Sequence, residues 1–254
     1  MEPLFGGTDR AGAFTLSTLE PARRYTAWMY EAIRPYCRGE MLELGSGTGN
    51  ISRHLLEAGH SLLLSDYQAA YCRYLSDTFG GGQHPGFRGV RRIDLADPAF
   101  DRKYGKLFGM FDTVFTLNVV EHIRDDEQAV RNAGKFLRED GTLIILVPAL
   151  PGLYNTLDRY LNHYRRYLPL QLVRLFGKSG MRVRHWQYFN AVGVAAWLYT
   201  GSIRRKKLLP PGSVRLFDRF VPLFRCMDPC FRKVVGLSLI IVGQKNKRMN
   251  QPGA

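Results

Sequence analysis

The sequence predicts an α/β fold, a doubly wound sheet in which parallel strands are joined by helical crossovers. Two observations lead to this prediction. Short apolar runs recur up to Pro148, and stretches with apolar residues at helical spacing lie between them. Several runs are too apolar to alternate with polar residues, as expected of strands covered on both faces. Repeated alternation of strand and helix is typical of a parallel sheet with right-handed crossovers.

The elements are expected in a regular order as far as Pro148. An amphipathic helix over 21–36 leads into a glycine-rich loop. We then expect strands at 41–44, 61–65, 87–93, 111–117 and 142–147, and helices at 51–58, 67–79 and 125–137. After Pro148 we expect a helix over 169–178, strands at 181–188 and 237–243, and between these strands an insertion over 190–236 with its own helices.

Composition limits the class of protein. The chain has 254 residues, of which 45% are hydrophobic and 12% aromatic, so it can bury a substantial core within one domain. The formal net charge of +14 indicates an anionic partner, such as nucleic acid, a phospholipid surface or an acidic small molecule. Charge alone does not choose among these partners.

The cysteines and the first residues indicate an intracellular protein. The cysteine spacing fits neither a common zinc site nor a disulfide framework, so we interpret the four cysteines as reduced thiols. The segment MEPLFGGTDR has no basic start followed by an apolar stretch. No apolar run reaches the roughly 18 residues needed to cross a bilayer. We therefore expect a cytoplasmic location.

The glycine-rich loop ELGSGTG, residues 43–49, follows the first expected strand. In an open α/β sheet, ligands bind beyond the carboxyl ends of the strands, where the winding changes direction. Glycine at positions 45, 47 and 49 lets the backbone turn sharply and approach a ligand closely. The third glycine comes one residue too early for the dinucleotide pattern G-x-G-x-x-G. Glu43 would repel phosphates and favours a cationic ligand.

Two further carboxylates follow the next strands. Asp66 comes directly after the second strand, where it can accept both hydroxyl hydrogens of a ribose. Asp94 lies at the end of the third strand and suits an exocyclic amine. Glycines, ribose acid and base acid together describe a nucleoside pocket.

At these residues the sequence resembles the class I S-adenosylmethionine-dependent methyltransferases, in the branch with an ELGxGxG loop and a fourth motif like NVVEHI (118–123). The resemblance covers residues 20–148. It implies a Rossmann-like sheet, mostly parallel with an antiparallel last strand, with S-adenosyl-L-methionine as cofactor and S-adenosyl-L-homocysteine as product. The expected cofactor-binding residues are Glu43, Gly45, Ser46, Gly47, Gly49, Asn50, Asp66, Tyr67, Asp94, Leu95 and Asn118.

The domain is then expected to have three parts. Residues 20–148 form the cofactor-binding core, residues 149–180 and 190–236 form a lid on the substrate side, and residues 237–244 form the final strand. All three belong to a single methyltransferase domain over 1–254.

The fourth motif raises the question of a metal. Ubiquinone-biosynthesis O-methyltransferases look similar here, but a second acid precedes their E-H pair and contributes to a metal site. This chain has Asn118 at that position, so we expect no metal. Glu121 and His122 are interpreted as an acid at a helix N-terminus and a neighbour packed beside the cofactor, with His122 kept as a catalytic candidate.

The segment DRYLNHYRRY, residues 158–167, is similar to a subset of bacterial methyltransferases with H-Y-R-R-Y after the fifth strand. His163 is the candidate general base, because an imidazole titrates near neutrality. The two arginines are expected to bind an acidic substrate group; alternatively, they cap a carboxylate while the tyrosines fill the core. The expected substrate-binding residues are Tyr25, Tyr164, Arg165, Arg166 and Asn190.

The insertion is strongly basic. RRKK (204–207) precedes VRLFDRFVPLF (214–224), in which Phe217, Phe220, Val221 and Phe224 form an apolar stripe and Pro222 is expected to bend or end the helix. Such a helix could rest on anionic lipid headgroups or close over an apolar substrate. The alternative is an ordinary packing helix with a solvated basic face.

These features predict a methyltransferase that acts on a small, largely apolar or lipid-like metabolite, with oxygen slightly preferred over carbon as acceptor. A nucleic-acid methyltransferase is the first alternative, although the chain lacks an N/D-P-P-Y/F motif and we expect no nucleic-acid partner. A cyclase or binding protein with the same fold is the second. Peripheral contact with an anionic membrane is a further expectation, and the sequence does not specify an oligomeric state.

Overall fold

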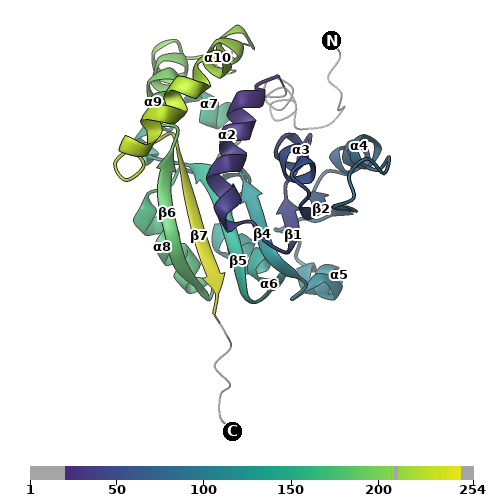
Figure 1. Ribbon diagram of the computed structural model, residues 1–254. Helices are drawn as coiled ribbons and strands as arrows, with labels where there is room; N and C mark the ends of the chain where they lie inside the picture. Colours follow the sequence, from purple (N-terminus) through teal and green to yellow (C-terminus); the bar gives the residue numbers. More distant parts are fainter. Residues whose placement is uncertain (1–20, 207, 209–210, 247–254) are drawn as a thin grey trace.

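A computed structural model describes residues 21–206, 208 and 211–246 (Figure 1). The expectations for MEPLFGGTDR and for Lys207 therefore lie outside the described residues. Within these residues, no helix is both long enough and apolar enough to cross a bilayer.

Seven strands form one sheet in the order β3-β2-β1-β4-β5-β7-β6. They are β1 (Glu40–Leu44), β2 (Ser61–Asp66), β3 (Phe87–Arg92), β4 (Phe111–Leu117), β5 (Leu137–Pro148), β6 (Met181–Phe189) and β7 (Ser238–Lys245). Strand β7 is antiparallel to both β5 and β6, and all other neighbouring strands are parallel. This confirms the predicted fold. The strand order changes direction between β1 and β4, which is where the sequence places the glycine-rich loop.

The predicted helices are present with small shifts at their ends. The described α-helices are α2 (Arg23–Ile33), α3 (Asn50–Glu57), α4 (Ala69–Phe79), α5 (Phe100–Tyr104), α6 (Asp126–Lys135), α7 (Thr156–Tyr160), α8 (Pro169–Lys178), α9 (Val192–Trp197) and α10 (Pro211–Met227). Asp125 begins α6 by accepting a hydrogen bond from the backbone N–H of Gln128, and Asn155 and Asp158 form a capping box on α7.

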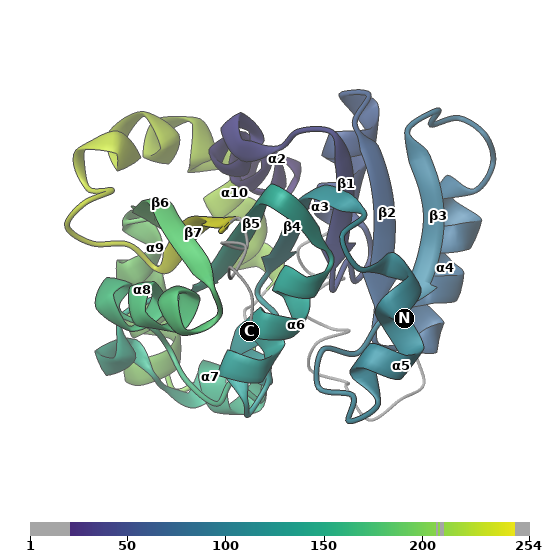
Figure 2. The same cartoon turned by 90° about the horizontal axis from the view of Figure 1, so that it is seen from below.

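Helices cover both faces of the sheet (Figures 1 and 2), and an apolar layer is buried on each face. Alternate residues of one strand face opposite layers: Leu143 and Ile145 pack in the layer under α6 and α8, whereas Ile144 and Leu146 pack in the layer under α2, α3, α4 and α10. A third, smaller cluster of Leu153, Leu157 and Trp197 lies between α7 and α9. The segments expected as a lid therefore have a small apolar core of their own.

The insertion has its own helices, as expected. Pro222 was expected to bend or end the helix, and of these two outcomes the structure excludes the second, because helix α10 (Pro211–Met227) continues past it. Proline has no backbone N–H to donate within a helix. Pro222 lies on an exposed turn of α10, where the helix tolerates the missing hydrogen bond. Within the predicted apolar stripe, Val221 is 2% exposed, whereas Phe220 is 47% exposed and packs on the ring of Phe224. Adjacent residues of a helix point about 100° apart, so Phe220 and Val221 lie on different faces of α10, and the sequence pattern did not show which face packs against α2.

Candidate active site

The glycine-rich loop connects β1 to α3 at the carboxyl end of the sheet. Gly45, Gly47 and Gly49 have φ angles of 78°, 54° and 76°, which lie in the left-handed region that glycine adopts without strain. A Cβ atom on Gly45 would also collide with Cγ2 of Val119, which follows β4. The loop therefore needs glycine at this position, and it lies directly beside the segment that contains Asn118.

Glu43 is buried beneath the loop and is 4% exposed. Its carboxylate accepts a hydrogen bond from the hydroxyl of Ser52 on α3. Burial raises the pKa of Glu43 to about 7, and repulsion from Asp66 adds to the rise, against hydrogen bonds from Ser52 and Ser46. The ionised form of Glu43 is therefore unfavourable in the folded protein, and a cation bound beside the carboxylate would stabilise it.

Asp66 ends β2 and ties the second strand to the loop. Its Oδ2 accepts a hydrogen bond of 3.1 Å from the backbone N–H of Gly47, and its Oδ1 accepts one of 2.9 Å from Gln68. Asp94 lies two residues beyond the end of β3, whose last residue pairs with Asp66. The three acids expected to bind a nucleoside thus lie at the carboxyl ends of three adjacent strands.

The other expected cofactor residues lie around the same edge of the sheet. Asn118 is exposed directly after β4 and has a left-handed φ of 56°. Tyr67 is 53% exposed. The Leu95 side chain is buried in the apolar layer, and its backbone carbonyl accepts a hydrogen bond of 2.9 Å from the side-chain amide of Asn132. Thr48 was not among the expected cofactor-binding residues, yet its buried hydroxyl has no hydrogen-bond partner among the described residues.

A second cluster of polar side chains forms around Asp158, which is fully buried. Its Oδ1 lies 3.0 Å from Nδ1 of His163 and accepts a hydrogen bond of 2.8 Å from Nε of Arg166. Its Oδ2 accepts hydrogen bonds from Trp197 and from the backbone of Asn155. Burial alone would raise the pKa of Asp158, but the hydrogen bond from His163 and the charge of Arg166 keep it below its usual value.

The ionised Asp158 fixes the orientation of His163. A carboxylate only accepts hydrogen bonds, so Nδ1 of His163 carries the proton and Nε2 is left as an acceptor. Nε2 lies 4.0 Å from Oε1 of Glu121. The sequence analysis singled out His163 but missed Asp158; the spacing D-x₄-H-x₂-R was the available signal.

Glu121 faces this cluster from the fourth motif. It lies in a 3₁₀ turn after β4, is fully buried, and neither carboxylate oxygen has a hydrogen-bond partner among the described residues. Burial raises its pKa to about 7, against attraction from His163 and Arg166. The backbone N–H of Tyr164 donates to the Glu121 carbonyl over 2.8 Å. Glu121 therefore faces the H-Y-R-R-Y segment; it lies in the first turn of a helix, as expected, and that helix is a short 3₁₀ helix.

Three of these side chains could hold a metal ion. Ligand atoms of Glu121, His122 and His163 lie within 4.8 Å of one another, and the rings of the two histidines meet edge to face with centroids 4.7 Å apart. Two imidazoles and a carboxylate suit first-row transition metals. The expectation of no metal rested on Asn118 alone, and the fold brings in His163, which is remote in sequence.

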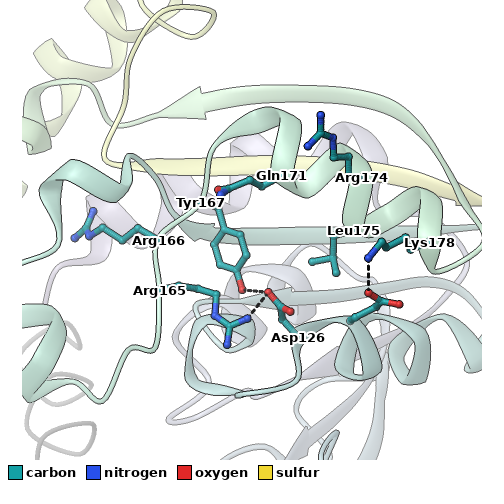
Figure 3. A pocket seen from close by; sticks show the side chains of 9 residues that line it. Asp126, Arg165, Arg166, Tyr167, Gln171, Arg174, Leu175 and Lys178 are labelled. Carbon is teal, nitrogen blue, oxygen red and sulfur yellow. Dashed lines mark hydrogen bonds and ion pairs between the residues drawn. The ribbon is translucent and has the colours of Figure 1, made fainter.

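The two arginines of the H-Y-R-R-Y segment are engaged within the protein. A pocket of about 490 Å³ lies between α6 and α8. In Figure 3, Arg165 is directed toward Asp126, whereas Arg166 points away from Asp126. Nη1 of Arg165 lies 2.9 Å from the Asp126 carboxylate. Arg166 is 4% exposed and stacks over the ring of Trp197. Arg166 thus pairs with the Asp158 carboxylate, which is the alternative interpretation of this segment. Because Arg166 is buried in this pair, it is not retained as a substrate-binding residue.

The fold brings together two of the three remaining residues expected to bind substrate, and the third, Tyr164, is 57% exposed. Tyr25 on α2 forms a side-chain hydrogen bond with Asn190, which follows β6 and is 2% exposed. Burial raises the pKa of Tyr25 to about 12, against this hydrogen bond. The Tyr25 ring also packs on Phe189 and Phe217, so an aromatic cluster joins the first helix to the insertion.

Residues 42–143 match a protein family described as a methyltransferase domain. The chain contains a methyltransferase domain. The matched segment runs from β1 into β5 and includes the glycine-rich loop, Asp66, Asp94 and the fourth motif. The lid segments lie outside it.

One curated protein is similar to part of this chain. A highly reducing polyketide synthase from Aspergillus nomiae is 31% identical over 116 residues, which are 43% of this chain and 4% of that protein. The chain therefore spans a small fraction of this curated relative's length.

Solved structures share the fold at low identity. A chain of the complex that contains the Haloferax volcanii Trm112 methyltransferase activator has a TM-score of 0.62 and 14% identity, over 95% of this chain and all of that one. The Haemonchus contortus phosphoethanolamine N-methyltransferase 2, solved with S-adenosyl-L-methionine, has a TM-score of 0.58 and 12% identity, over 90% of this chain and 57% of that one.

Proposed function

We propose that this methyltransferase transfers a methyl group from S-adenosyl-L-methionine to the oxygen of a small, largely apolar acceptor. The observation that carries this proposal is His163, held by Asp158 with its free ring nitrogen facing Glu121, beside the carboxyl end of β4. A carbon acceptor is less favoured, because a hydroxyl needs a base and the cluster provides one.

The residues around the glycine-rich loop fit the cofactor. Glu43 is a buried carboxylate that a sulfonium or ammonium group would stabilise. The unpartnered hydroxyl of Thr48 and the left-handed glycines leave polar groups and space for a ligand against the backbone. When bound, S-adenosyl-L-methionine supplies a methyl group already activated by its positive sulfur.

The protein then has to position the acceptor and remove its proton. His163 Nε2 takes the hydroxyl proton as the oxygen–methyl bond forms and the sulfur–methyl bond breaks, leaving a methyl ether, S-adenosyl-L-homocysteine and a protonated imidazole. Asp158 stabilises the charge on the imidazole, as its 3.0 Å contact with Nδ1 allows. Tyr154 and Tyr164, which are 36% and 57% exposed beside His163, offer aromatic surface to an apolar acceptor.

Calorimetry with S-adenosyl-L-methionine and S-adenosyl-L-homocysteine tests the cofactor; the absence of binding by both nucleosides would remove the proposal. Formation of S-adenosyl-L-homocysteine on a panel of apolar alcohols and phenols then tests the reaction. We expect His163→Gln to lower kcat by roughly 10²–10⁴ with unchanged cofactor binding. His185→Gln on β6 is the matched control, and an equal loss in both variants would contradict a base at position 163.

A further inference from the structure

The apolar surface of this protein is concentrated on the insertion. Nine of the sixteen exposed large hydrophobic side chains among the described residues lie between Leu198 and Val234. Four of them share one face of α10: Leu216, Phe220, Leu223 and Met227, which are 59%, 47%, 56% and 43% exposed. Their spacing of four, three and four residues places them within one narrow sector of the helix.

Helix α10 therefore has two apolar faces with different surroundings. Val221 is 2% exposed and packs in the layer under α2, together with Phe217 and Phe224. The face that carries Phe220 and Leu223 has no such cover among the described residues. A helix that only packs on its own domain does not need the second face.

The charges of the insertion are sorted in the same way. Its two acids face the protein: Asp218 accepts a hydrogen bond from the Tyr25 backbone, and Asp228 accepts one from the Ala191 backbone and is 8% exposed. Its exposed charges are basic, and Arg215 and Arg219 lie beside the exposed apolar face of α10. The surface thus has apolar side chains at its centre and the basic residues Arg215 and Arg219 along one side.

We propose that the exposed face of α10, bordered by Arg215 and Arg219, docks on the surface of an anionic phospholipid bilayer. A cationic border attracts acidic headgroups, while Phe, Leu and Met side chains enter the boundary with the acyl chains. A second copy of the chain fits less well, because a two-fold contact would bring two copies of the same cationic side into one interface. A nucleic acid offers no apolar surface for the centre.

Docking would also place the candidate active site near the membrane. Helices α9 and α10 lie beyond the end of the sheet opposite to that toward which β7 runs (Figure 1). That is the end where the parallel strands carry the glycine-rich loop and the His163 cluster. Under the proposed function, an acceptor dissolved in the bilayer would reach the site from this side.

Sedimentation of the full chain with vesicles tests the docking. We expect binding to vesicles of phosphatidylcholine mixed with phosphatidylglycerol, weakening as salt rises, and no binding to phosphatidylcholine alone. Arg215→Gln with Arg219→Gln should lower the partition coefficient by roughly 30-fold. Phe220→Ser with Leu223→Ser should lower it at least about tenfold. Circular dichroism and calorimetry with S-adenosyl-L-homocysteine verify that each variant is folded.

Matched changes elsewhere on the surface serve as controls. Leu170→Ser on α8, where the side chain is 58% exposed, and Arg73→Gln with Arg91→Gln should leave vesicle binding unchanged. Equal binding with and without phosphatidylglycerol, or equal losses in the controls, would overturn the proposal. A lipid-free dimer that Phe220→Ser with Leu223→Ser converts to a monomer would also overturn it. If the protein binds S-adenosyl-L-homocysteine but not the vesicles, membrane docking is contradicted and the proposed function is not.

Discussion

Glu43→Gln gives a direct measure of the electrostatics beneath the glycine-rich loop. In the folded protein the pKa of Glu43 rises from 4.5 to about 7. At about 1.4 kcal/mol per pKa unit, this rise corresponds to roughly 3 kcal/mol. Because the folded state binds the proton more tightly than the unfolded chain, this stabilisation is present in full below pH 4.5 and is lost as pH rises through about 7.

Thermal unfolding at a series of pH values measures this loss. The wild type should lose Tm relative to Glu43→Gln as pH rises from about 4.5 to 8, and at the upper end the variant should melt roughly 6–12 °C higher. Glu57→Gln on α3, an exposed carboxyl only a few turns away, should follow the wild type. If Glu43→Gln and the wild type show the same dependence of Tm on pH, the reasoning about Glu43 is refuted.

The same variant links stability to ligand binding. A cation next to the ionised carboxylate offsets its burial, so S-adenosyl-L-methionine should bind the wild type more tightly as pH rises through about 7. In Glu43→Gln the affinity should be lower and should no longer depend on pH in this range. Calorimetry at several pH values gives both quantities.

Three other predictions concern single contacts. Gly45→Ala should weaken nucleoside binding measured by calorimetry, because its Cβ would collide with Val119; Val119→Ala in the same chain should restore only part of the affinity, since the left-handed φ of 78° remains. Trp197→Phe should lower Tm by roughly 2–4 °C through loss of the hydrogen bond to Asp158, whereas Trp186→Phe should change it less, because the Trp186 indole makes no such bond within the described part of the chain. Treatment with a chelator should leave turnover unchanged if His163 acts as a base; activity that is lost and then restored by zinc would make His163 a metal ligand instead.

The fold was predictable because its elements carry local signals. Apolar runs of strand length, separated by helical patterns, were enough to place β1 to β5, and β5 differs mainly by starting at Leu137 rather than at 142. The acids at 43, 66 and 94 could be assigned to one edge because parallel strands end on the same side. Local pattern and topology therefore agree in the first half of the chain.

The candidate active site was only partly predictable, because its contacts are remote in sequence. His163 was singled out by residue type, but its partner Asp158 belongs to a capping box that also reads as a helix start. Glu121 meets His163 across 42 positions of sequence, and no periodicity reports such a contact. The exposed side of α10 was missed for a related reason: Phe217 and Phe220 look alike until the position of α2 is known.

The place of β7 bears on how the protein can assemble during synthesis. This strand is made after every other described strand, yet it pairs in the interior of the sheet between β5 and β6. Until β7 has left the ribosome, β5, with Ile144 and Leu146, is an unpaired edge strand of an incomplete sheet. Such an edge can mispair with strands of other nascent chains. A stop codon only ten positions upstream of Lys245 would therefore remove an inner strand and leave two open borders.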